Sequence, residues 1–135
     1  MKYWNDLPDS MLFNRIFTRP ISIEKVELFK IEIDNDRPHI FIEFDLVGEL
    51  PDSPPEKWKR RKFNRCRAGL LCYDVEKFSA SNIPNRSIFN IEINKDQKGF
   101  QINLKNEASH VSLFSGSLSI SGPSVYLAAE NEQPH

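Results

Sequence analysis

The chain has 135 residues, of which 39% are hydrophobic and 27% charged, and its formal net charge is −1. This length suits one domain with its own core. No run of about 18 apolar residues occurs and aromatic residues are plentiful, so the composition argues against a membrane-embedded chain and against disorder. We therefore expect one soluble domain that spans residues 1–135.

A short amphipathic helix is predicted close to the start of the chain. Asp9 or Ser10 is a suitable N-cap, apolar residues recur at helical spacing in SMLFNRIF, and Pro20 ends the segment. We expect this helix at about residues 9–17. The opening residues carry charges throughout and lack the apolar run of a secretory signal, so we also expect a cytoplasmic protein.

The body of the chain, at about 21–127, has the composition and the period of two that are typical of β-strands. Apolar residues of the segment 21–34 change phase, which predicts a bulge near residues 24–28. The sequence DNDRP predicts a turn at 34–38, and regular alternation follows over 40–47. We expect two strands joined by this turn.

The second half of the strand region contains a predicted β-hairpin at 87–105. In it, FNIEIN and FQINLK alternate on either side of the turn-rich NKDQKG. Two more short strands are predicted around Gly116 and Gly122. The polar residues 128–135 are expected to form a frayed tail.

These elements together predict a mainly β fold. Strands that do not alternate with helices favour an antiparallel sheet, on which the short N-terminal helix is expected to pack. We expect the sheet to curl into a half-barrel or a sandwich. An exposed strand edge at 109–115 would allow the protein to form a homodimer.

The two cysteines, Cys66 and Cys72, lie six residues apart in one predicted strand. At about 3.3 Å per residue their Cα atoms would be about 20 Å apart, which is too far for a disulfide. The spacing also lacks the close pairs that a structural zinc site needs. We expect two free thiols and no metal or cofactor.

The most unusual segment is PPEKWKRRKFNRCR, with seven Lys and Arg residues between Lys57 and Arg67. The rest of the chain then has 11 basic residues against 19 acidic ones. Three interpretations stay open: a solvated loop with Trp58 packed on the sheet, a surface for nucleic acid or another polyanion, and a surface for an acidic protein. The overall charge of −1 weighs against nucleic acid.

The same loop has a residue order that points to a family. ELPDSPPEKWK, together with YWNDLP near the start, the strand exit FDLVGELP and the later LLCYDVEKFSASNI, resembles family 50 of the bacterial immunity proteins. The resemblance extends from about Trp4 to Tyr126. Its most recognisable element is Pro54, Pro55 and the Lys57-Trp58 pair.

The resemblance implies a mostly β protein that protects a bacterium from the toxin encoded beside it. Such a protein acts by tight stoichiometric binding of its cognate toxin, with no membrane involved. The candidate contact residues fall in two groups of opposite charge, and the acidic one also includes Asp34 and Asp36. The others are Trp58, Lys57, Lys59, Arg60 and Arg61 in the basic loop, and Asp45, Glu49 and Asp52 at neighbouring strand ends. A cationic toxin would favour the acidic group and an acidic toxin the basic one.

The reactive side chains give little support to an enzyme. His39, His110 and His135 are scattered, and none pairs with another metal ligand at close spacing. The Ser-rich segment after residue 110 lacks a G-x-S-x-G nucleophile motif, and no phosphate-binding or dinucleotide-binding loop occurs. We therefore expect a binding protein, with a polyanion-binding module based on the 57–67 loop as the alternative.

Overall fold

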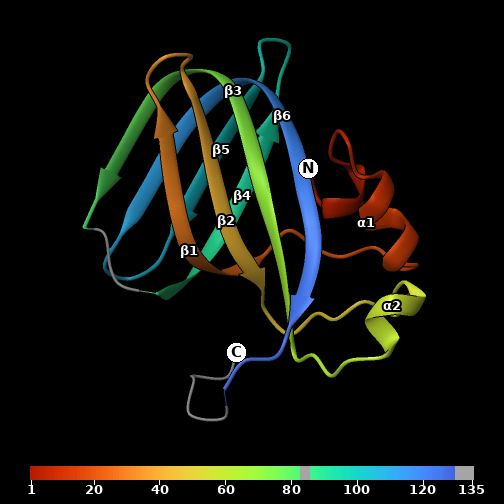
Figure 1. Cartoon of the computed structure of the whole chain (residues 1–135). Coiled ribbons are helices and arrows are strands. Elements are labelled where there is room, and N and C mark those ends of the chain that lie inside the picture. The colour runs from red at the N-terminus through yellow and green to blue at the C-terminus, as the bar shows by residue number, and fades with distance from the viewer. Residues whose placement is uncertain (83–85, 130–135) are drawn as a thin grey trace.

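The computed structural model describes residues 1–82 and 86–129. Short helices occupy the N-terminal segment and one loop, and long strands make up the rest (Figure 1). In chain order the elements are η1 (Trp4–Asp6), α1 (Met11–Ile16), β1 (Lys25–Asp34), β2 (His39–Leu46), α2 (Glu56–Lys59), β3 (Arg65–Ser81), β4 (Ser87–Lys95), β5 (Phe100–Lys105) and β6 (His110–Tyr126).

The strands form one antiparallel sheet in the order β1-β2-β3-β6-β5-β4, and the sheet closes into a barrel. This confirms the predicted mainly β, antiparallel fold. The sheet closes completely because β1 also pairs with β4, through Lys25–Leu28 against Ser87–Asn90. The longest contact is between β3 and β6, which pair along most of their 17 residues.

Most predicted elements lie where the periodicity places them. The hairpin at 87–105 is confirmed as β4 and β5, and the turn that follows Asp34 joins β1 to β2. The bulge in β1 falls between Leu28 and Lys30, slightly later than predicted. Helix α1 is a little shorter than the predicted 9–17.

The prediction of two short strands around Gly116 and Gly122 is wrong. Residues His110–Tyr126 form one continuous strand, because β3 is equally long and pairs with it past both glycines. The predicted free edge at 109–115 is also wrong, since β6 is flanked there by β3 and β5. The predicted tail lies outside the described residues from residue 130 onward.

The apolar side chains of alternate strand positions fill the inside of the barrel, and the N-terminal segment adds to this core. Trp4 is 1% exposed, and its ring lies 5.1 Å from that of Phe44, centroid to centroid. Backbone hydrogen bonds hold the N-terminal segment to the barrel. In one of them the Ile120 N–H donates to the Pro8 carbonyl at 3.0 Å. Cys66 and Cys72 are buried free thiols of this core.

Candidate functional site

The loop between β2 and β3 has the basic residues and Trp58 at its surface. The short helix α2 starts after Pro55, whose carbonyl accepts the Trp58 N–H at 2.9 Å. The Trp58 side chain is partly buried and packs against the core. Together with Lys57 and Arg61 it lines a shallow hollow of about 280 Å³. Lys59 forms an ion pair with Glu56 at 3.1 Å. Lys57, Arg60 and Arg61 are exposed like Lys59, and none of these three has an ion pair among those given for the described residues.

The seven basic residues of the run do not form one patch. The run is divided at Arg65, where β3 begins. Arg65 is buried, and its Nη1 lies 3.8 Å from Glu27 Oε1. Arg67 is also in β3 and contacts other residues of the barrel wall. The exposed basic surface around α2 is therefore smaller than the sequence predicts.

Asp45 was expected to be an exposed acidic group, and this expectation is wrong. The side chain is completely buried on the outer wall of the barrel, where its carboxylate accepts a hydrogen bond from Arg67 Nε at 3.2 Å and another from the Tyr126 hydroxyl. Arg67 also donates to the Tyr126 hydroxyl at 3.1 Å. Burial, and the hydrogen bond to Asp45, raise the pKa of Tyr126 to about 12.

Two further arginine contacts extend this network across the wall. Arg86 Nε lies 2.7 Å from Glu27 Oε2. The guanidinium groups of Arg67 and Arg86 both lie over the ring of Phe29, at 4.0 and 4.8 Å from its centroid. Because each carboxylate has a guanidinium partner, the network joins β1, β2, β3 and β6 as one ion-paired layer.

Two more of the predicted acidic contact residues, Glu49 and Asp52, hold the loop between β2 and β3 to the N-terminal segment. Arg19 Nη2 lies 2.9 Å from Glu49, and Arg19 Nη1 lies 3.0 Å from Asp52. The Thr18 hydroxyl and the Thr18 N–H also donate to the Asp52 carboxylate, and these bonds lower the pKa of Asp52. These two carboxylates therefore have intramolecular partners.

A second hollow, which the sequence did not reveal, lies between the β1–β2 turn and β3. We call it the tip pocket. It has a volume of about 270 Å³ and is lined by Ile33, Asp34, Asn35, Pro38, His39, Ile40, Val75, Glu76 and Phe78. The turn lies at the top in Figure 1 and α2 at the lower right, so the two hollows are at different ends of the molecule. Of its lining residues only Asp34 was among the contacts predicted from the sequence, and Phe78 gives a further hint as a lone aromatic residue among polar neighbours.

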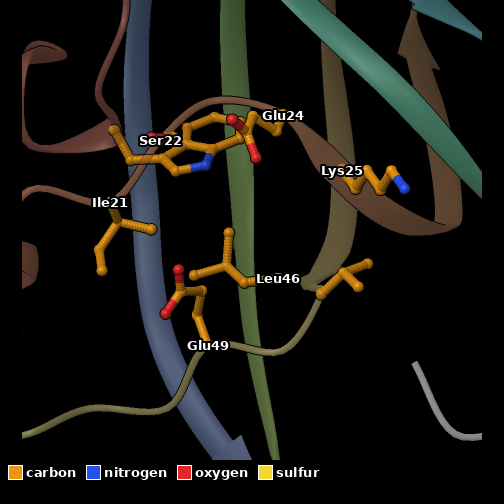
Figure 2. A pocket seen from close by; sticks show the side chains of 8 residues that line it. Ile21, Ser22, Glu24, Lys25, Leu46 and Glu49 are labelled. Atoms are coloured by element: carbon orange, nitrogen blue, oxygen red, sulfur yellow. The ribbon is translucent and has the colours of Figure 1, made fainter.

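A third hollow of about 150 Å³ lies between the N-terminal segment and the exit of β2 (Figure 2). Figure 2 shows the Glu49 carboxylate beside Leu46 and Ile21, and Glu24 above them on the side of Ser22. It is small, and Glu49 is already paired with Arg19. This hollow therefore offers little room for a ligand.

The described residues contain no cluster of three or more His, Cys, Asp or Glu side chains that could hold a metal ion. Of the histidines, which were not expected to bind a metal, His39 contacts Asp34 at 3.3 Å and the ring of Tyr73, and His110 lies near Asn103. Among the described helices, none is long and apolar enough to cross a membrane.

The closed barrel with its short helices defines a small, mainly β domain. Residues 9–126 match the family model described as Immunity protein 50. The match covers nearly the whole chain, so the chain belongs to this family. No curated protein and no solved structure gave a match.

Proposed function

We propose that the protein neutralises a toxin by forming a tight one-to-one complex with it, without turnover. The family match over residues 9–126 is the observation that carries this proposal. An inhibitor of this kind must leave almost no free toxin, and a Kd of 1 nM corresponds to about 12 kcal/mol of binding free energy. Such affinity requires a few well-packed anchor side chains within a larger contact surface.

The test is co-expression with the toxin domain encoded beside this chain. We expect survival of the host cells and co-purification of the two proteins at a ratio of one to one. In vitro, residual toxin activity should fall linearly as the protein is added and should reach its minimum at equimolar amounts. Protection at a small fraction of the toxin concentration would instead indicate catalysis and would contradict the proposal.

One observation favours a second function, the binding of a polyanion at α2. Lys57, Arg60, Arg61 and Lys62 are exposed there beside the partly buried Trp58. Binding of this kind depends steeply on salt because phosphate contacts release counterions. Replacing Arg60 and Arg61 by Ala should then weaken binding to single-stranded DNA and reduce its salt dependence. Absence of measurable binding at low salt would exclude this alternative.

A further inference from the structure

Exposed large apolar side chains gather at the tip pocket. Ile33 is 53% exposed, Phe78 37% and Tyr73, which contacts His39 beside the pocket, 40%. Single exposed apolar residues need no explanation, but several of them around one hollow typically mark a contact surface. By contrast, the apolar residue of the α2 hollow, Trp58, is partly buried against the core.

The strand pairing explains why these side chains are uncovered. β2 begins at His39, and its last link to β3 is the Val75 N–H, which donates to the Pro38 carbonyl at 2.8 Å. β3 continues to Ser81, and among the described strands only β6 pairs with it there. A bulge between Val75 and Lys77 bends β3 at this corner. The pocket is therefore formed by the ends of these strands together with the turn between β1 and β2, and it is present in the chain without a partner.

The charged side chains that line the tip pocket are carboxylates, beside His39, whose Nε2 lies 3.3 Å from Asp34; Arg37 of the adjoining turn and Lys77 are not among the lining residues. Asp34 and Glu76 are among its lining residues, and none of the described residues that line it is Lys or Arg. Asp36 follows in the adjoining turn, where its N–H donates to Asp34. The α2 hollow is the reverse, since Lys57 and Arg61 line it and none of the described residues that line it is a carboxylate. Complementary charge speeds encounter and selects the partner, whereas apolar burial supplies most of the affinity.

From these observations, and resting on the proposed function, we infer that the tip pocket is where the toxin docks. The pocket accepts an apolar side chain from a positively charged segment of the toxin. Ile33 and Phe78 contact that side chain, and Asp34 and Glu76 face the flanking cationic groups. The α2 surface, with its opposite charge, lies outside the centre of this contact.

The experiment is a titration of the full chain with the toxin domain, inactivated by a point substitution, followed by calorimetry and by stopped-flow kinetics. Ile33→Lys places a cation and removes apolar surface at the pocket, so the Kd should rise about 30-fold or more. Phe78→Ala should weaken binding in the same direction. The Asp34→Asn, Glu76→Gln double variant should mainly slow association and flatten its salt dependence.

Two controls separate this inference from the proposed function. Met11→Lys makes the same change at a residue of α1 that is 71% exposed, and it should leave the Kd within about twofold. A Lys57→Ala, Arg60→Ala, Arg61→Ala variant tests the other hollow. Each variant is first checked for wild-type melting temperature, which is expected because the changed side chains are at the surface.

Each outcome has a definite meaning. Loss of affinity in the pocket variants, with both controls unchanged, supports docking at the tip pocket. Loss in the α2 variant while Ile33→Lys and Phe78→Ala bind normally overturns the inference but leaves the toxin complex intact. If the wild-type chain itself does not bind the toxin, the proposed function fails, and the inference that depends on it fails as well.

Discussion

Asp45 on β2 and Arg67 on β3 face each other on the outer wall of the barrel, with Arg67 Nε 3.2 Å from Asp45 Oδ1. The carboxylate is completely buried, although an outer barrel face is normally open to water. Arg67 stacks on Phe29 and Tyr126 as well, so this one arginine joins its own strand, β3, to β1, β2 and β6. A buried ion pair is costly to disrupt because the remaining charge stays without compensation.

Replacing Arg67 by Met, which keeps the apolar stem and removes the charge, should lower the free energy of unfolding by about 3 kcal/mol. Urea denaturation followed by tryptophan fluorescence measures this change. Arg61→Met is the matched control, because Arg61 is exposed, and it should stay within about 0.5 kcal/mol of the wild type. Equal losses in the two variants would show that the pair contributes nothing to stability.

The buried thiols predict a loss of stability at alkaline pH. Burial raises the pKa of both thiols, Cys66 and Cys72, from the ordinary value of 9.0 to about 12. At Cys66 the negative charge of Asp45 adds to this rise in pKa. Below pH 9 the stabilising effect of the neutral thiol is fully present. As the pH rises toward 12 it is lost, because the unfolded chain ionises first. Each thiol then reduces the free energy of unfolding by up to about 1.4 kcal/mol per pH unit.

Urea midpoints measured under reducing conditions at pH 8, 9 and 10 test this prediction. The wild type should lose stability across the series, and Cys72→Ala should lose it less steeply. Parallel curves for the two proteins would argue against a buried neutral thiol at position 72. Tyr126, whose pKa is also raised to about 12, begins to contribute only above pH 10, the ordinary value for this side chain.

Gly99 should tolerate no side chain. It has a φ of +153°, and a Cβ at this position would lie 2.3 Å from the Ser115 carbonyl oxygen. That oxygen belongs to the backbone of β6 and cannot move without disturbing the strand, so Gly99→Ala should cost about 2 kcal/mol or more. Gly48 is the control, since its φ is +73° but its surroundings are open.

Gly48→Ala therefore carries only the cost of the left-handed backbone, about 1 kcal/mol. Thermal and urea unfolding of the two variants would measure the difference. A loss in Gly99→Ala no larger than in Gly48→Ala would mean that the hairpin end shifts freely.

The two tryptophans should differ in their effect on stability. Trp4 is 1% exposed and lies against Phe44, so Trp4→Ala should reduce the free energy of unfolding by about 3–5 kcal/mol. Trp58 is only partly buried, and Trp58→Ala should cost about 1–2 kcal/mol. Far-ultraviolet circular dichroism with urea titration compares them. A larger loss at Trp58 would place the main anchor of the core in the α2 loop.

The alternation of apolar residues was enough to predict several elements of the fold. Apolar and polar residues alternate in the strands at 87–105 and in the strand that follows the turn after Asp34. This alternation predicts strands because one face of each must be buried. The N-terminal helix and the family resemblance were also evident from local residue order. These features depend on neighbours in the chain, and so the sequence alone determines them.

The closure of the barrel and the state of the charged residues were decided only by the tertiary structure. Asp45 lies more than 20 positions before Arg67 in the sequence, and strand pairing makes them direct neighbours. The basic run divides because β3 begins at Arg65, and the tip pocket exists because β2 begins only at His39 while β3 continues past it to Ser81. Periodicity shows which face of a strand a side chain takes. Which strand lies beside it, and hence whether a charge is paired or free, depends on contacts between distant segments.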